Sequence, residues 1–284
     1  MTTKPSRSAN PDGRMPLMEH IRELRSRLLK AMLAILVGTG IGLWQFDRVW
    51  SFLQQPYCQL PQQNRLGKGC GLVVNGLTEG FFLNLKIALI VGVVLASPIW
   101  LYQLWAFVAP GLYQRERRWT YIFLTASVPL FVGGAFLAYV TLDKGLGILL
   151  SFVPHGTTAL VTVTSYLGYA VAMLLIFGVT FELPLFVVIL NLAGVLTHAR
   201  IKKSRRLIIF GLFVFAAVAT PSQDPFTMLA LALPTVVLFE VAEVIAYIHD
   251  RRKAARPDPY ADLSDDEASP LDLPDGEIED GERV

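Results

Sequence analysis

Six long apolar runs, separated by polar and charged segments, account for most of the chain. They cover residues 28–46, 81–107, 119–140, 166–196, 207–220 and 226–248. At a rise of about 1.5 Å per residue, each of the first four runs can cross a hydrocarbon core of about 30 Å as a helix. No run alternates apolar and polar residues over about ten positions, as the strands of a transmembrane β-barrel do. The pattern therefore predicts an all-α integral membrane protein with six transmembrane helices.

The last two runs are shorter than the others. The fifth holds 14 residues between Arg206 and Pro221, and the sixth stays apolar for 14 residues before Glu240. A helix of that length spans about 21 Å, which is less than the core thickness. A hairpin buried in a soluble protein has similar lengths, but the charged flanks favour a membrane hairpin. We predict two short, paired final helices that thin the bilayer locally or are sheltered by their neighbours.

Composition and charge support a membrane protein and give it an orientation. Of the 284 residues, 53% are hydrophobic and only 17% are charged, which is too apolar for a soluble domain of this size. With the N-terminus in the cytoplasm, 19 lysines and arginines fall in cytoplasmic segments and four in external loops. Cytoplasmic loops of membrane proteins carry this excess of positive charge. We expect a multi-pass protein of the cell (cytoplasmic) membrane with both termini in the cytoplasm.

Acidic residues are concentrated at the C-terminus. Residues 257–284 hold 11 acidic residues and one basic residue, whereas residues 1–256 hold 24 basic and 12 acidic residues. A polar, acidic segment that contains proline cannot bury a hydrophobic core. We therefore predict a disordered cytoplasmic N-terminus over 1–14, a six-helix membrane domain over 15–252, and an acidic, disordered cytoplasmic tail over 253–284.

Both cysteines of the chain, Cys58 and Cys70, fall in the first predicted external loop. The outer face of a cell membrane is oxidising, so the pair can close a disulfide across that loop. The alternative is two unpaired thiols. We favour the disulfide, because both cysteines lie in the one loop where pairing is chemically possible.

Nothing in the sequence marks an enzyme. There is no GxSxG elbow, HExxH zinc motif, phosphate-binding glycine loop or CxxC pair, and the four histidines lie in different segments. We expect no catalytic residue, no metal site and no cofactor.

Several ionisable residues lie in the membrane runs. Glu182 lies near the middle of the fourth run, where a carboxylate costs at least about 2.5 kcal/mol. Its side chain must therefore face a cavity or a partner, or take up a proton in the course of function. The alternative is that Glu182 is protonated and makes a helix–helix hydrogen bond. Glu240 and Glu243 lie near the inner end of the sixth run. Either they have a function, or their side chains extend to the membrane interface. Lys86 lies seven residues after Glu79, and these two can neutralise each other.

Two carboxylates, Glu23 and Glu116, lie inside basic and aromatic clusters at residues 18–27 and 102–118. Arginines that anchor the inner face and an aromatic belt explain most of each cluster, but they do not explain the carboxylates. A carboxylate oriented by neighbouring arginines is suited to bind a cationic ligand. A guanidinium binds it best, through a pair of forked hydrogen bonds.

Four stretches of the chain resemble the TatC family, the largest subunit of the twin-arginine protein translocase. They read HIRELRSR at 20–27, WAFVAPGLYQRERR at 105–118, FGVTFELP at 177–184 and TPSQDPF at 220–226. The resemblance spans residues 15–252 in order. It implies a receptor and core scaffold that binds twin-arginine signal peptides of folded proteins at the cytoplasmic face. It also implies assembly with TatA-type and TatB-type single-span subunits for export driven by the proton-motive force. The resemblance further implies a lipid bilayer as the surrounding medium and several copies of the chain in the complex, and we expect no nucleic acid as a partner.

The resemblance also implies roles for individual residues. Glu116 is the expected main acceptor of the signal peptide's arginines, with Glu23 as its partner. The surface around them would be shaped by Phe107, Arg25, Arg27, Pro110 and Arg118.

Partner subunits are expected at a second set of residues. Glu182 would be the polar group of the concave membrane face that they approach, and the last two helices would dock the TatB-type subunit near Asp224. Glu240 belongs to the same intramembrane polar set. The turn before Asp224 is one residue longer than the TPPD of many members. Met228 stands where those members have glutamine, which puts a polar contact at that site in doubt.

Two other functions remain open on sequence alone. A proton-coupled small-molecule secondary transporter would use Glu182 and Lys86 as relay groups. Such transporters usually contain internal repeats, and no clear repeat relates residues 28–140 to 166–248. A ligand sensor with no transport role is the third possibility.

Overall fold

The computed structural model describes residues 17–60, 70–108, 117–154, 157 and 159–255. All its regular elements within these ranges are helices, apart from one isolated bridge between Val73 and Thr162. The prediction of an all-α protein is confirmed. The helices are α1 (Leu17–Trp44), α2 (Phe46–Cys58), α3 (Glu79–Leu95), α4 (Ser97–Val108), α5 (Arg117–Ser151), α6 (Val163–Thr180), α7 (Leu183–Leu192), α8 (His198–Ala219) and α9 (Pro225–Ala254). The expected disordered ends, 1–14 and most of 253–284, lie outside the described residues.

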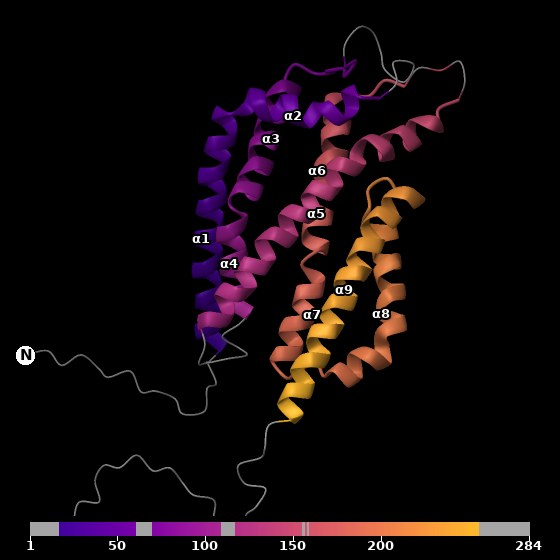
Figure 1. Ribbon diagram of the computed structural model, residues 1–284. Helices are drawn as coiled ribbons and strands as arrows, with labels where there is room; N and C mark the ends of the chain where they lie inside the picture. Colours follow the sequence, from indigo (N-terminus) through magenta and orange to yellow (C-terminus); the bar gives the residue numbers. More distant parts are fainter. Residues whose placement is uncertain (1–16, 61–69, 109–116, 155–156, 158, 256–284) are drawn as a thin grey trace, which may run out of the picture.

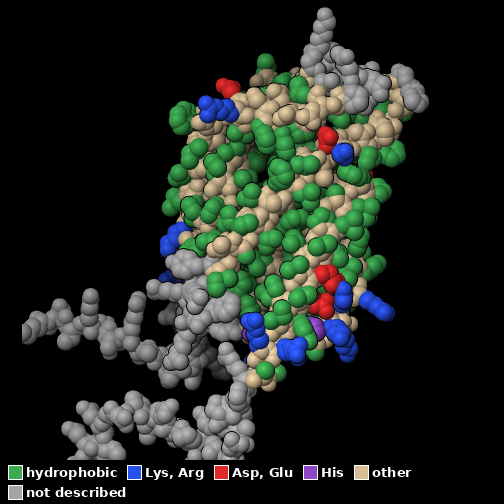
Figure 2. All heavy atoms as spheres, in the orientation of Figure 1, with side chains coloured by type: hydrophobic (Ala, Val, Ile, Leu, Met, Phe, Trp, Pro, Cys, Tyr) green, Lys and Arg blue, Asp and Glu red, His purple; other side chains and the backbone are tan. Residues whose placement is uncertain are grey.

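The helices form an elongated bundle (Figure 1). Helix α1 packs along α3 and α4, the long α5 crosses the bundle obliquely against α6, and α9 packs against α7 and α8. Hydrophobic side chains cover the middle of the face shown in Figure 2, and charged side chains gather towards its two ends. A surface that is apolar around its middle and charged at its ends matches a lipid bilayer with water on both sides.

Four helical segments of the described chain are long and apolar enough to cross a membrane. They are residues 21–44, 122–151, 163–192 and 225–254. Helices α3 and α4, bent by 58° at their junction, make a fifth if the pair is one span. Helix α8 is not among them, because its first nine residues contain five lysines and arginines. The six-span count therefore stays a prediction.

The prediction of two short final helices is wrong for both, because α8 already has 22 residues where 14 were predicted. Helix α9 has 30 residues and continues past Glu240 to Ala254. Glutamate is a good helix former, so Glu240 does not end the helix. Arg205 of α8 donates hydrogen bonds to both carboxylate oxygens of Glu240. A carboxylate neutralised in this way is tolerated in a long membrane helix.

Two of the predicted continuous runs are broken. The second run divides into α3 and α4 at Ala96, just before Ser97 and Pro98. The fourth divides into α6 and α7 at Phe181 and Glu182, with Pro184 in the first turn of α7. Proline lacks the N–H that would continue the hydrogen-bond ladder, so each break lies just before a proline. The second break places Glu182 at a helix end inside an apolar segment.

The first predicted external loop contains a helix that the apolar runs missed. Helix α2 lies across one end of the bundle (Figure 1). Its apolar side chains recur at helical spacing and pack onto the core: Phe46, Val49, Trp50, Leu53 and Tyr57. This helix was not predicted from the sequence.

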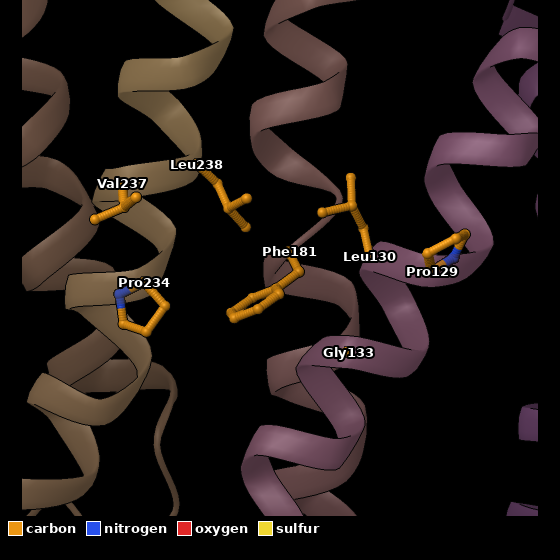
Figure 3. Close-up of a pocket in the computed structure, with 7 residues that line it drawn as sticks. All are labelled: Pro129, Leu130, Gly133, Phe181, Pro234, Val237 and Leu238. Carbon is orange, nitrogen blue, oxygen red and sulfur yellow. The ribbon is translucent and has the colours of Figure 1, made fainter.

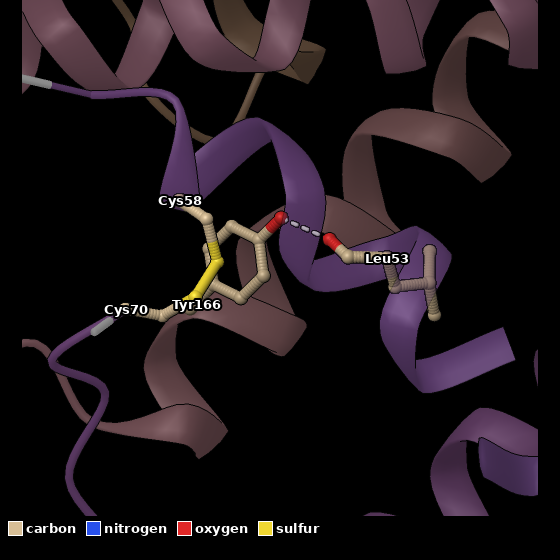
Figure 4. The surroundings of a disulfide bond; sticks show 4 residues. All are labelled: Leu53, Cys58, Cys70 and Tyr166. Atoms are coloured by element: carbon tan, nitrogen blue, oxygen red, sulfur yellow. Dashed lines mark hydrogen bonds between the residues drawn. A yellow bond between two sulfur atoms is a disulfide. The ribbon is translucent and has the colours of Figure 1, made fainter. Parts of the chain in front are cut away.

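A disulfide joins the end of α2 to the segment that leads into α3, as Figure 4 shows. It links Cys58 to Cys70 with 4.8 Å between their Cα atoms, so the predicted pairing is confirmed. Nearby, the hydroxyl of Tyr166 donates a hydrogen bond to the carbonyl oxygen of Leu53. The disulfide and this hydrogen bond fasten α2 over the N-terminal end of α6.

Removing the disulfide is expected to destabilise this cap. The bridge closes a loop with a sequence separation of 12 residues, and closing a loop of about that length contributes about 3 kcal/mol in the chain-entropy model. We expect Cys58→Ser, Cys70→Ser and the double variant to lower the thermal unfolding temperature in detergent by the same amount. Equal losses are expected because any one of them removes the bridge. Free reaction of both thiols with an alkylating reagent, without reductant, would show that the bridge is absent.

Candidate functional site

The break between α6 and α7 holds a carboxylate inside the bundle. Glu182 occupies the N-cap position of α7 but makes no capping hydrogen bond with its side chain. The residue is 8% exposed. Its Oε2 accepts a hydrogen bond from Ser127 Oγ of α5 at 2.7 Å, and Ser127 in turn accepts one from Nε1 of Trp105 in α4 at 2.8 Å. Three helices therefore meet at this polar chain.

The second carboxylate oxygen of Glu182 is different. Oε1 is buried and has no hydrogen-bond partner among the described residues. Buried polar atoms in proteins are almost always hydrogen-bonded, because an unpaired one keeps its full desolvation cost. An oxygen left without a partner in the interior therefore marks a place where another molecule can supply one.

Close packing of α5 on α6 brings this chain together. Gly134 of α5 lies so near α6 that a methyl group there would come within 2.5 Å of the Phe177 carbonyl oxygen. Gly178 of α6 likewise faces Phe131. Without side chains at these two positions, the helices approach closely enough for Ser127 to reach Glu182.

An apolar groove of about 460 Å³ lies beside the break. Figure 3 shows that its lining residues come from α5, the α6–α7 break and α9. All are nonpolar: Pro129, Leu130, Gly133, Phe181, Pro234, Val237 and Leu238. Phe181 directly precedes Glu182 in the chain, so the groove lies at the same helix break as Glu182, which is not itself a lining residue. A nonpolar groove in a membrane protein can take lipid chains or the side chains of another helix.

The residues expected at the cytoplasmic face are described only in part. Glu23 accepts two hydrogen bonds from Arg27, one turn later in α1, from Nη2 at 2.6 Å and Nε at 2.9 Å. Arg25 is exposed, and Phe107 is partly buried near the end of α4. Two of the expected residues, Pro110 and Glu116, lie outside the described residues. Arg118 belongs to the first turn of α5, but the placement of its side chain also lies outside the description.

Asp224, an expected partner contact, caps a helix. It is 5% exposed and occupies the N-cap of α9, where it accepts a hydrogen bond from the Thr227 backbone N–H at 2.8 Å. Burial pushes the pKa of Asp224 up, but hydrogen bonds from Ser222 and Thr227 outweigh it and hold the pKa below its ordinary value. The extra residue of this turn, Gln223, adopts a φ of 49°, and Met228 packs against the core.

Glu240 belongs to a network that the sequence did not reveal. Arg205 of α8 lies between Glu240 and Glu243 of α9, with its Nε 3.6 Å from Glu243 Oε2. His198 lies 3.7 Å from the other oxygen of Glu243. About two turns further along α9, Asp250 accepts a hydrogen bond from the His198 backbone N–H at 2.7 Å. The charged start of α8 and the charged end of α9 lie together because the two helices are antiparallel. This arrangement is the feature that predicts such contacts.

The suggested pairing of Glu79 with Lys86 is not present. Glu79 accepts hydrogen bonds from Thr164 and from the backbone N–H groups of Asn75 and Gly76, at 2.6 and 3.2 Å for the last two. No ion pair joins it to Lys86, which is exposed on α3; both residues are described. Glu79 instead holds the N-terminal ends of α3 and α6 together.

Comparison with known proteins gives these features a family. The family model for the Sec-independent protein translocase protein TatC matches residues 19–234. The chain belongs to the TatC family. The match covers both helix breaks, the polar chain at Glu182 and the groove lining up to Pro234.

Individual TatC proteins align with this chain over most of their length. The TatC protein of Frankia casuarinae is 50% identical over 273 residues, which cover 93% of this chain and 75% of that protein. The TatC protein of Aquifex aeolicus is 34% identical over 242 residues, which cover 84% of this chain and 98% of that protein. A crystal structure of the twin-arginine translocase receptor TatC in DDM gives a TM-score of 0.67 at 32% identity, over 80% of this chain and 99% of that one.

Membership of the TatC family establishes the general role of the chain. It is a multi-pass membrane protein of a Sec-independent protein translocase, a transport subunit and not an enzyme. A translocase of this family implies a complex with further subunits.

Proposed function

We propose that this TatC-family chain is the receptor and core scaffold of a twin-arginine translocase. In this proposal it binds the twin-arginine signal peptides of folded proteins at the cytoplasmic face of the cell membrane. It assembles with TatA-type and TatB-type single-span subunits, in several copies, for export driven by the proton-motive force. The observation that carries the proposal is the likeness, over 80% of this chain, to a crystal structure of a twin-arginine translocase receptor.

The signal-peptide surface is proposed at the end of the bundle where α1 begins and α4 ends. Helix α1 packs along α4, so Glu23 and Phe107 lie at the same end of the molecule (Figure 1). The segment with Pro110 and Glu116 follows α4 directly, and Arg118 begins α5. Glu23 is already paired with Arg27, so a guanidinium arriving there must compete for its carboxylate. This supports Glu116 as the main acceptor and Glu23 as the secondary one.

The partner subunits are proposed to approach Glu182 and the groove beside it. A single-span helix brings apolar side chains that suit the nonpolar lining and a polar group for the open Oε1. Asp224 and Met228 take a different part in this proposal. Asp224 orders the start of α9 as its cap, and Met228 offers an apolar contact, so the TatB-type subunit docks there by packing and not by a polar contact.

Six membrane spans with both termini in the cytoplasm complete the proposal. The basic start of α8 and the basic end of α9 lie at the same end of the bundle as the start of α1 (Figures 1 and 2). Helix α9 carries Arg251, Arg252 and Lys253 in its last turn. Positive charge gathered at one end supports a cytoplasmic location for that end.

Reporter fusions test this topology. A reporter active only outside the cytoplasm should give a signal when fused within residues 58–70 or 222–224. It should stay inactive when fused at Lys203 or after Arg256, while a cytoplasmic reporter at these two positions should be active. An external signal from the Lys203 fusion would contradict the proposed α8–α9 hairpin.

The alternative of a proton-coupled small-molecule transporter finds no support in the side chains it needs. Lys86 is exposed on α3, and no hydrogen bond or ion pair joins it to Glu182, although both residues are described. The polar partners of Glu182 are instead Ser127 and, through it, Trp105. A relay between Lys86 and Glu182 is therefore not formed.

Complementation separates the receptor from the transporter. Cells that lack their own TatC, supplied with this chain and its TatA-type and TatB-type subunits, should export a folded reporter with a twin-arginine signal peptide. The same reporter with two lysines should stay in the cytoplasm, and a protonophore should stop export. If export fails at normal protein levels while purified chain in proteoliposomes drives proton-coupled solute uptake, the transporter is the better description.

A further inference from the structure

Trp105, Ser127 and Glu182 form a hydrogen-bond chain whose direction can be worked out. The three residues lie on α4, on α5 and at the α6–α7 break, and they are 3%, 0% and 8% exposed. The indole N–H of Trp105 can only donate, so Ser127 Oγ must accept from it. Ser127 has one proton of its own, and it donates that proton to Oε2 of Glu182. Oε2 is therefore an acceptor.

The same chain gives the two oxygens of Glu182 different roles. Oε2 is occupied by Ser127, while Oε1 is buried without a hydrogen-bond partner among the described residues. A proton on the second lone pair of Oε2 would weaken this oxygen as the acceptor of the Ser127 hydrogen. A proton or an outside donor that reaches Oε1 disturbs none of the existing hydrogen bonds. Oε1 is therefore the carboxylate oxygen that is left for a further hydrogen bond.

We propose that Trp105 and Ser127 are positioning residues that hold Oε2 of Glu182 as a fixed acceptor and so present Oε1 to a hydrogen-bonding group of an arriving single-span subunit. The proposal rests on the proposed function, because it assigns the partner contact to one oxygen of Glu182. Neither residue touches the partner in this account. Each acts by fixing the orientation of the carboxyl group at the α6–α7 break, where Phe181 lines the apolar groove.

Trp105 also makes this arrangement measurable. Its ring packs near Phe123 and Phe186, with centroids 6.4 Å apart in each case, and it lies two residues before Phe107 on α4. A change at Glu182 that alters the Ser127 hydrogen bond must alter the environment of the Trp105 indole N–H.

Fluorine NMR of the full chain labelled with 5-fluorotryptophan, in detergent, tests this link. The Trp105 signal is assigned by its loss in Trp105→Phe. We expect it to move in Ser127→Ala and in Glu182→Ala. Trp100 provides the matched control, because its indole N–H donates at 2.9 Å to the Val93 carbonyl oxygen and not to the chain. The Trp100 signal should keep its position. A Trp105 signal that stays in place in both Ser127→Ala and Glu182→Ala overturns the proposal.

Co-purification with the TatB-type subunit tests the role in partner binding. Ser127→Ala and Trp105→Phe should each weaken retention of the subunit, Ser127→Ala by about 10-fold, which is at the upper end of the effect of one neutral hydrogen bond. Trp100→Phe should leave retention within about 2-fold. In the Glu182→Ala background, Ser127→Ala should cause no further loss, because residues that act through one another are not additive. An equal, additional loss in that background would show that Ser127 acts independently and would overturn the proposal.

The two readouts distinguish this proposal from the proposed function. If wild-type chain retains no partner subunit and binds no signal peptide, the proposed function fails. The NMR experiment then still decides whether Trp105 and Ser127 hold Glu182. If wild-type chain retains the partner and Ser127→Ala retains it equally well, the proposed function stands and the positioning role is wrong.

Discussion

Replacing Glu116 with alanine is expected to weaken the binding of a twin-arginine signal peptide roughly 10- to 150-fold. A hydrogen bond between charged groups contributes about 1.5–3 kcal/mol, and losing one gives a decrease of that size. A guanidinium binds a carboxylate through two parallel hydrogen bonds, a geometry that an ammonium group cannot reproduce. Isothermal titration of purified chain with a synthetic signal peptide measures the change.

Matched variants separate this role from a structural one. Glu116→Gln should fall between wild type and alanine, because an amide keeps an acceptor but loses the charge. Glu23→Ala should have a smaller effect, since Arg27 already holds the Glu23 carboxylate at 2.6 Å. If Glu116 only fastened its own loop through Arg117 or Arg118, its loss would not change the choice of peptide. A Glu116→Arg variant should lose twin-arginine peptides and gain binding to peptides with acidic residues at those two positions. Unchanged affinity of Glu116→Ala, in correctly inserted protein, would contradict the assignment.

Glu182→Ala is expected to reduce retention of the single-span subunits about 10-fold or more, because the lost contact is a charged or strongly polar hydrogen bond in an apolar surrounding. Binding of the signal peptide should change much less. Glu182 lies at the α6–α7 break, deep in an apolar segment, and not at the end of the bundle where α1 begins. Co-purification and peptide titration on the same preparations measure both effects.

Glu182→Gln is the control for this second prediction. Glutamine keeps a carbonyl oxygen that can accept from Ser127 Oγ, and it adds an amide that can serve a partner's acceptor. Retention of the single-span subunits should therefore decrease less in Glu182→Gln than in Glu182→Ala. Equal losses of peptide binding and subunit retention in Glu182→Ala would contradict the separation of the two sites.

Much of the fold follows from local patterns in the sequence. The lengths of the apolar runs predict the helices, and the compartment of the first loop predicts the disulfide between Cys58 and Cys70. Two further features have signals in the sequence but were not predicted from it. The prolines Pro98 and Pro184 mark the two helix breaks, and the spacing of the apolar residues in 46–57 marks α2. Each of these signals acts through the backbone or through one helix face, so no knowledge of distant contacts is needed.

The remaining features depend on contacts between helices. The pairing of Glu240 with Arg205 cannot be predicted from either helix alone, because Arg205 lies on α8. The candidate site also depends on contacts between helices. The apolar surroundings single out Glu182 in the sequence, but Ser127 and Trp105 lie 55 and 77 positions away, and only the close packing of α5 on α6 brings them into line. Sequence patterns therefore predict which carboxylate is unusual, while its partners come from the tertiary structure.

The receptor assignment is tested most directly by one comparison on the purified full-length chain. Two synthetic signal peptides that differ only in their paired residues, arginines in one and lysines in the other, are titrated into the same protein at the same salt concentration. The account predicts saturable binding of the arginine peptide and binding of the lysine peptide that is weaker by about 10-fold or more, because the lysines lose the forked hydrogen bonds. Equal affinity for the two peptides, or no binding of either, would contradict a receptor that recognises twin arginines.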